Sequence, residues 1–125
     1  MNDEVHMNAA LAQAKQAKTA GELPFGAVVV CDGKVIAQNR CRESHEKTVA
    51  AHAELQAVND ACRALKTTDL KDCTIYCTNE PCLMCASAIF QANVKRIVIG
   101  ALRDDFPDIL RPRKLRIEDL ASDLS

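Results

Sequence analysis

The sequence predicts an α/β fold, a three-layer α/β/α sandwich around a mixed sheet of four to five strands. Runs of β-branched residues alternate with segments of helical spacing, and this alternation is typical of a sheet covered by helices. The strand–helix–strand order implies parallel crossovers, whereas a turn in the first third of the chain implies one antiparallel hairpin. We therefore expect a mostly parallel sheet with the hairpin at one side.

The first third of the chain predicts a helix followed by the hairpin. Residues 3–20 carry Ala, Leu, Gln and Lys without a helix breaker until Gly21, which suits a glycine C-cap. Two β-branched runs, residues 25–31 and 34–39, are separated by the Asp-Gly pair at 32–33. Because that pair accepts positive φ angles, the two runs form an antiparallel hairpin.

The middle of the chain predicts two helices and two further strands. Residues 40–50 are polar and aperiodic, so they form a loop. Apolar residues then recur at three-and-four spacing over residues 52–65 and again over residues 82–92. Each of these helices precedes a strand, at residues 72–78 and 95–101, and the second strand is almost wholly apolar, as a buried strand should be.

The tail is less regular, and the composition favours one domain. Residues 113–117 (RKLRI) predict a fifth strand, and the EDLASD segment that follows opens like a helix without room to continue. With 125 residues, of which 48% are hydrophobic and 26% charged, the chain fits a single globular domain over residues 1–125.

Two helix starts carry residues that suggest a metal site. His52 and Glu54 lie in the first turn of one helix, and Cys82 and Cys85 follow Pro81 at the start of the next. Helix N-termini that follow strands gather at one edge of an α/β sheet, so one imidazole and two thiolates can meet there. One His and two Cys form a zinc set with a fourth position left for water, which is typical of a catalytic site.

Glu54 need not bind metal, because it can lean over a water in that fourth position and move protons. A closed structural zinc site would need a fourth ligand instead. Cys77, His45 and Cys41 are the candidates for that ligand. A non-enzymatic protein with a structural zinc is therefore an alternative, although such a protein has no use for Glu54.

The other cysteines are predicted to be buried free thiols, and the protein is predicted to lie in a reducing compartment. The chain has seven cysteines, an odd number, and begins with acidic and polar residues that do not resemble a signal peptide. No apolar run is long enough to span a membrane. We expect a cytoplasmic protein without membrane contacts, in which four cysteines of apolar stretches are small core residues: Cys31, Cys62, Cys73 and Cys77.

The pattern H-x-E followed by P-C-x-x-C is the signature of zinc-dependent nucleobase deaminases. From about residue 3 to residue 105 the chain resembles the cytidine deaminase superfamily. PFGAVVV, HAE and NEPCLMCASAI resemble the branch of guanine deaminases and bacterial tRNA adenosine deaminases. This resemblance implies that His52, Cys82 and Cys85 bind Zn²⁺ and that Glu54 is the proton shuttle.

The resemblance also implies substrate contacts and a partner. Asn39, Phe25, Ala53 and Pro81 match positions that border the substrate in the family, although Asn39 also suits a turn at the hairpin end and Phe25 suits core packing. Family members form homodimers whose helices border each pocket, and they commonly continue further at the C-terminus. We therefore expect a homodimer and a deaminase domain that is short at its C-terminus.

The predicted reaction is hydrolytic deamination of an exocyclic amine of a base, with release of ammonia. Net charge is −1, and three Phe, one Tyr and no Trp offer little for stacking extruded bases. A free nucleobase or nucleoside, guanine first, is thus favoured over the alternative substrate, adenosine in tRNA. A late basic cluster is interpreted as a solvated face or a helix C-terminus: Arg103, Arg111, Arg113, Lys114 and Arg116.

Overall fold

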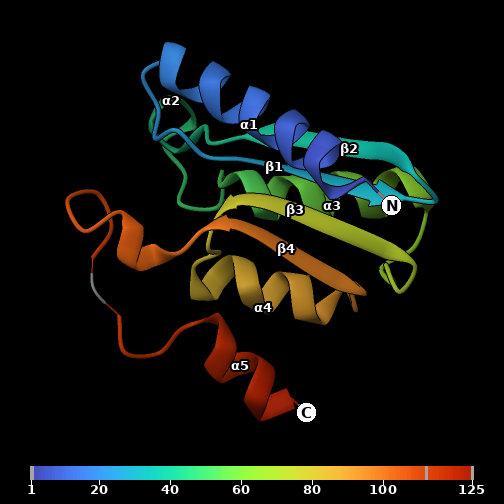
Figure 1. Ribbon diagram of the computed structural model, residues 1–125. Coiled ribbons are helices and arrows are strands. Elements are labelled where there is room, and N and C mark those ends of the chain that lie inside the picture. The colour runs from blue at the N-terminus through green and yellow to red at the C-terminus, as the bar shows by residue number, and fades with distance from the viewer. Residues whose placement is uncertain (1, 112, 125) are drawn as a thin grey trace.

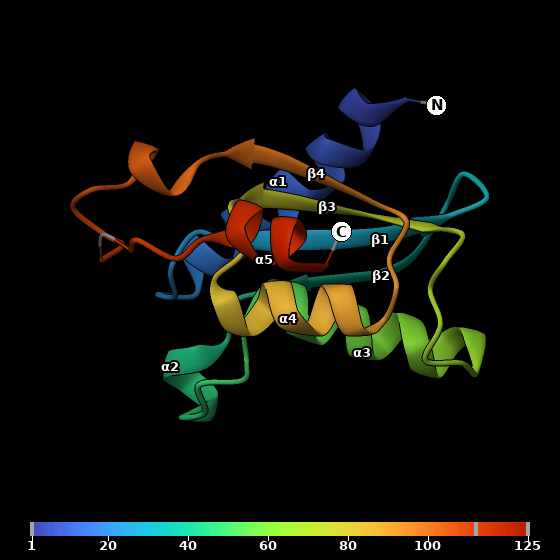
Figure 2. The ribbon, with the colours of Figure 1, turned by 90° about the horizontal axis from the view of Figure 1, so that it is seen from below.

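The computed structural model describes residues 2–111 and 113–124. Four strands form one sheet that has helices on both faces (Figures 1 and 2). The three-layer α/β/α sandwich and the mixed sheet are confirmed. The elements along the chain are α1 (Asp3–Thr19), β1 (Gly26–Cys31), β2 (Lys34–Arg40), α2 (Glu43–Glu46), α3 (Ala53–Leu65), β3 (Cys73–Asn79), α4 (Leu83–Gln91), β4 (Arg96–Ala101) and α5 (Ile117–Leu124), with a short 3₁₀ turn at Arg103–Asp105.

The sheet is less parallel than the sequence predicted. Its strand order is β2-β1-β3-β4, and only β3 and β4 pair in parallel, whereas β1 is antiparallel to both of its neighbours. The crossover through α3 does connect strands that run in the same direction, since β2 and β3 are both antiparallel to β1. However, β1 lies between them, so the hairpin enters the sheet and the expectation of a mostly parallel sheet was wrong.

The alternation of side chains along the strands divides the core between the two faces. On one face, Val28, Val30 and Tyr76 pack with Ala10 of α1. The opposite face holds the larger cluster, to which β1 and β3 contribute their other set of side chains and α3 and α4 contribute small residues. The small side chains let α3 and α4 approach this face of the sheet closely.

Helix α1 fits against β1 because Gly26 has no side chain. A Cβ atom at Gly26 would lie 2.3 Å from the Ala10 carbonyl oxygen and 2.6 Å from the Ala14 nitrogen, both in the backbone of α1. At the start of the helix, Asp3 accepts a hydrogen bond from the buried Tyr76 hydroxyl at 2.6 Å and pairs with Arg96 of β4. These contacts join α1 to three strands of the sheet.

The predicted turns are confirmed. Asp32 and Gly33 have positive φ angles of 52° and 77° at the tip of the β1–β2 hairpin, and Gly21 has a φ of 82° directly after α1. Gly33 and Gly21 thus occupy the left-handed backbone region that glycine tolerates best.

The tail differs from the expected fifth strand. No strand forms over residues 113–116 of the described chain, and α5 begins at Ile117. The Asp119 carboxylate accepts a hydrogen bond from the Arg116 backbone N–H at 2.8 Å, so it caps the first turn, and α5 packs against α4. The helix that seemed to lack room therefore forms eight residues, and the strand prediction was wrong.

All seven cysteines lie within the described chain and are free thiols, and Cys73 and Cys77 are buried in the larger core cluster as expected. In residues 2–111 and 113–124, none of the helices has the length and apolar character that crossing a membrane requires. The homodimer and the domain bounds stay predictions.

Candidate metal centre and active site

Helices α3 and α4 begin at the same edge of the sheet, and their N-cap residues are the predicted ligands. His52 is the N-cap of α3 and Cys82 is the N-cap of α4. Neither side chain caps its own helix, although Ser, Thr, Asp or Asn would do so at that position. The imidazole and the thiol are instead directed toward one another, with Cys85 beside them.

The spacing of the three side chains fits a tetrahedral zinc ion. The His52 Nδ1 atom lies 3.6 Å from the Cys82 sulfur and 3.5 Å from the Cys85 sulfur. A tetrahedral zinc ion with typical bond lengths holds a nitrogen and a sulfur ligand about 3.6 Å apart. All three ligand atoms lie within 4.8 Å of one another, so His52, Cys82 and Cys85 could hold a metal ion together.

The environment of Cys82 favours the thiolate that metal binding needs. The Cys85 thiol lowers the pKa of Cys82 most, and burial opposes this effect while His52 adds to it, so that the pKa lies at about 4. Thiolates are the form of cysteine that binds zinc.

A fourth protein ligand is not found among the described residues. The one group there with metal-binding geometry consists of His52, Cys82 and Cys85. The three candidates for a closed site have other places: Cys77 lies in the larger core cluster, Cys41 packs with Ala17 and Phe25, and His45 bonds to Glu22. The donor set is thus the open, three-ligand type.

Glu54 lies in the first turn of α3 and is only 3% exposed. Burial is the main cause that raises the pKa of its carboxyl to about 7. Glu54 also lines a cavity of about 530 Å³ together with the predicted ligands His52 and Cys82. This volume is in the usual range for sites that bind small molecules or single bases.

The predicted substrate contacts divide into two pairs. Phe25 and Ala53 line the cavity, whereas Asn39 and Pro81 are not among its lining residues. The Asn39 amide donates a hydrogen bond to the Asp60 carboxylate at 2.7 Å and accepts one from Arg42 at 3.0 Å. In this structure Asn39 therefore connects β2 to α3, and its contact with a substrate stays a prediction.

Several cavity residues were not identified from the sequence. Asn79, at the end of β3, and Leu110, beyond β4, belong to the lining, as do three arginines, Arg103, Arg111 and Arg113. The arginines had been noticed as a basic cluster, but charge alone does not reveal which side chains face a site. For Asn79 the available signal was its position at the carboxyl end of a buried strand, where ligands of α/β proteins bind.

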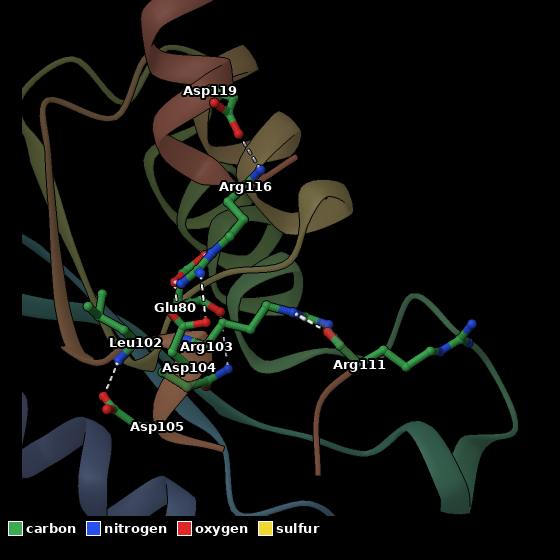
Figure 3. A network of polar contacts seen from close by, with 9 residues as sticks. Glu80, Leu102, Arg103, Asp104, Asp105, Arg111, Arg116 and Asp119 are labelled. Atoms are coloured by element: carbon green, nitrogen blue, oxygen red, sulfur yellow. Dashed lines mark hydrogen bonds and ion pairs between the residues drawn. The ribbon is translucent and has the colours of Figure 1, made fainter. Parts of the chain in front are cut away.

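The segment after β4 carries these arginines and forms one wall of the cavity. Glu80 joins this wall to the loop between β3 and Cys82 (Figure 3). Glu80 is 2% exposed, and its carboxylate accepts hydrogen bonds from the Arg103 backbone N–H at 3.0 Å and from Arg116 Nε at 2.8 Å. Arg116 also pairs with Asp104 at 2.9 Å. Because Glu80 lies two residues before Cys82, the same loop positions the ligand and the cavity wall.

A model of known protein families adds to this geometry. The family described as MafB19-like deaminase matches residues 1–123 of the chain. The chain belongs to the MafB19-like deaminase family. The superfamily and the branch that the motifs resemble are thereby confirmed, since the relatives of this family member include both tRNA adenosine deaminases and a guanine deaminase.

Three curated relatives illustrate the range. The chain is 43% identical over 100 residues to the tRNA-specific adenosine deaminase of Bacillus subtilis. This match covers 79% of this chain and 62% of that enzyme. It is 44% identical over 104 residues to the tRNA-specific adenosine deaminase of Agrobacterium fabrum, covering 81% of this chain and 67% of that one. The Bacillus subtilis guanine deaminase is 38% identical over 106 residues, covering 84% of this chain and 68% of that enzyme.

Solved structures give a similar result for this MafB19-like deaminase. A structure from a study of A-to-I editing by tRNA wobble-position deaminases matches with a TM-score of 0.76 and 42% identity, covering 78% of this chain and 71% of that chain. The Bacillus subtilis guanine deaminase matches with a TM-score of 0.81 and 28% identity, covering 99% and 92%. The two tRNA-specific adenosine deaminases and the tRNA-deaminase structure described above are more identical to this chain than guanine deaminase is, so our preference for guanine over tRNA is not the one that these relatives favour.

Proposed function

We propose that this protein is a zinc-dependent hydrolytic deaminase that converts adenosine in tRNA to inosine and releases ammonia. The observation that carries the proposal is the tetrahedral spacing of His52 Nδ1 and the Cys82 and Cys85 sulfurs beside the buried Glu54. A closed structural site would show a fourth ligand and would not need a buried carboxylate next to an open position.

His52, Cys82 and Cys85 would hold the zinc. When bound there, zinc supplies the Lewis acidity that makes water nucleophilic at neutral pH. The ligands reach it from two helix N-termini, and these stabilise the thiolates through the helix dipoles.

Glu54 moves the protons. Its carboxylate accepts a proton from the attacking water while the water oxygen bonds to C6 of the adenine ring, and the acid then protonates the ring nitrogen N1. The proton of the new C6 hydroxyl group then passes through Glu54 to the exocyclic amine, the C–N bond breaks, and ammonia leaves as the C6 carbonyl forms. Water and adenosine thus yield inosine and ammonia, and Glu54 returns to its starting state.

The arginines of the cavity wall support an RNA substrate. Arg103, Arg111 and Arg113 line the same cavity as Glu54. Among residues 2–111 and 113–124, the side chains of Arg111 and Arg113 have no ion-pair or hydrogen-bond partner, so both guanidinium groups are available. Guanidinium groups beside a base pocket suit the phosphates that flank an extruded nucleotide, and a free base carries no phosphate.

The decisive experiment compares RNA and free bases with the same zinc-loaded protein. Transcribed tRNAs that carry adenosine in the anticodon are incubated with the protein, and inosine is measured by mass spectrometry of the digested RNA. Guanine, adenine, cytosine and their nucleosides are tested by ammonia release. We expect inosine in at least one tRNA, at a rate far above that of any free base. Ammonia from a free base without inosine in RNA would contradict the proposed substrate.

Guanine is the second candidate substrate, because the match to the solved guanine deaminase covers 99% of this chain and 92% of that chain. A cavity of about 530 Å³ also has room for one purine. Guanine deamination in the same assay, with xanthine as the product, would select this candidate.

A further inference from the structure

The second ring nitrogen of His52 has a partner that the metal set does not include. His52 Nδ1 faces the two sulfurs, and His52 Nε2 lies 2.9 Å from the Glu43 carboxylate oxygen Oε2. A hydrogen bond from Nε2–H to this carboxylate leaves the Nδ1 lone pair directed at the sulfurs, which is the tautomer that a metal requires.

Glu43 lies on the four-residue helix α2. This helix belongs to the link between β2 and α3, where the sequence predicted a loop over residues 40–50. A separate carboxylate anchors this helix. Glu22, with a side chain only 1% exposed, accepts hydrogen bonds from the backbone N–H groups of Ser44 and His45, each at 2.9 Å. The ring nitrogen Nδ1 of His45 lies 2.7 Å from the same carboxylate. One buried acid thus holds the residues that directly follow Glu43.

The link is also attached on its other side. Arg42 donates its backbone N–H to the Ala51 carbonyl at 2.9 Å, and its guanidinium reaches the Asn39 and Gln56 side chains at 3.0 and 3.3 Å. The residue before Glu43 is therefore joined to β2, to α3 and to the backbone next to His52. With Glu22 behind α2, these contacts fix where the Glu43 carboxylate lies.

We infer that Glu43 is a positioning residue for the metal centre and that Glu22 anchors it. Glu43 fixes the tautomer and the ring plane of His52, and the negative charge makes the imidazole a stronger ligand. This inference rests on the metal centre of the proposed function, but it does not depend on which substrate is deaminated. Outer partners of this kind typically change metal affinity by about 10- to 100-fold when they are removed.

The test measures zinc affinity rather than activity. Zinc is titrated into metal-free protein in competition with a chromophoric chelator, for the parent protein and for Glu43→Ala, Glu43→Gln and Glu46→Gln. Glu46 is the matched control, because it lies on the same helix α2 and is exposed. We expect Glu43→Ala to weaken zinc binding by about 10- to 100-fold, Glu43→Gln to weaken it less because the amide oxygen still accepts the hydrogen bond, and Glu46→Gln to bind like the parent.

Two results would overturn the inference, and each has a different meaning. Zinc affinity of both Glu43 variants within twofold of the parent would show that Glu43 does not act on the metal centre. No zinc binding by the parent would remove the proposed function itself. Circular dichroism of the metal-free proteins checks that the variants fold, and Glu43→Gln preserves the size of the side chain if Glu43→Ala does not fold.

Discussion

At the scale of single residues, the clearest test concerns Glu54. A proton shuttle and a carboxylate that only stabilises the start of a helix predict very different effects of the same substitution. If it shuttles protons, Glu54→Gln keeps the size of the side chain but removes its acid–base function, so turnover should fall by about 10²- to 10⁴-fold or more while zinc content stays near one per chain. If Glu54 served only the helix start, the change would cost at most about 1 kcal/mol of stability and leave turnover intact. Turnover and zinc content are measured on the same preparation.

The matched control for this variant is Glu118→Gln, which removes an exposed carboxylate from the first turn of α5. It should change neither turnover nor zinc content. A zinc-loaded Glu54→Gln protein that works within tenfold of the parent rate would contradict the proton-shuttle role.

Cys85 provides the corresponding test of the metal ligands. Cys85→Ser replaces a thiolate by a hydroxyl that binds zinc poorly, so the purified protein should lose most of its zinc. Cys77→Ser is the control, since Cys77 is also a fully buried cysteine but belongs to the core cluster. It should lower thermal stability and keep the zinc. Metal analysis by mass spectrometry distinguishes the outcomes, and equal zinc in both variants would contradict the ligand assignment.

Residue spacing was sufficient to predict a deaminase and a possible metal-binding group, but it did not predict which residues surround that group. His52, Cys82 and Cys85 were named because two helix starts at one edge of an α/β sheet bring one imidazole and two thiols together, as in an open zinc site. Glu43 was not named, because nothing in a polar loop shows that it folds into α2 and returns to His52. Asn79 did have a signal in its position at the carboxyl end of a buried strand, but the cavity that it lines forms only when β3 and the segment beyond β4 meet.

At the scale of elements, the positions of helices and strands were predictable, whereas their order in the sheet was not. Periodicity reports which face of a segment is buried, and it located α1, α3, β3, α4 and β4 within a residue or two. It carries no information on which strands are neighbours, so the placement of β1 between β2 and β3 was missed. The prediction of a fifth strand in the tail was wrong. Local sequence does not show that Arg116 contacts Glu80, which lies 36 residues away in sequence.

The contact between Glu80 and Arg116 should contribute strongly to stability. Arg116→Met would leave the Glu80 carboxylate, which is 2% exposed, with the Arg103 backbone N–H as its one remaining hydrogen-bond partner among residues 2–111 and 113–124. Breaking a buried ion pair costs about 3 kcal/mol. Arg63→Met is the control, because the Arg63–Asp60 pair is just as well formed at 3.0 Å but its side chains are 75% and 49% exposed. That pair should be worth less than about 1 kcal/mol.

Urea unfolding of the two variants and the parent measures these free energies. A loss for Arg116→Met no larger than for Arg63→Met would show that the Glu80 carboxylate is solvated, and that the wall beyond β4 is held by other contacts.

At the scale of the whole molecule, two segments that are distant in the sequence together form the walls of the cavity. The link with α2 and the segment after β4 lie at the same end of the sheet (Figure 1). Glu43 from the first and the arginines from the second line the cavity from opposite parts of the sequence. The cavity lining holds three carboxylates, Glu43, Glu54 and Glu80, and three arginines, and the arginines are grouped on the wall beyond β4.

This grouping of arginines makes a prediction about RNA binding. Each phosphate contact by a cationic side chain steepens the dependence of log K on log salt by about 0.7 to 0.9. Arg111→Gln with Arg113→Gln should therefore weaken binding of an anticodon stem-loop and reduce the slope by about 1 to 2. Lys15→Gln with Lys18→Gln removes the same charge from exposed positions on α1 and should leave the slope unchanged. Fluorescence anisotropy over a salt series measures both. Equal slopes for the two double variants would mean that the arginines of the cavity wall do not meet phosphates, and the case for an RNA substrate would lose its structural support.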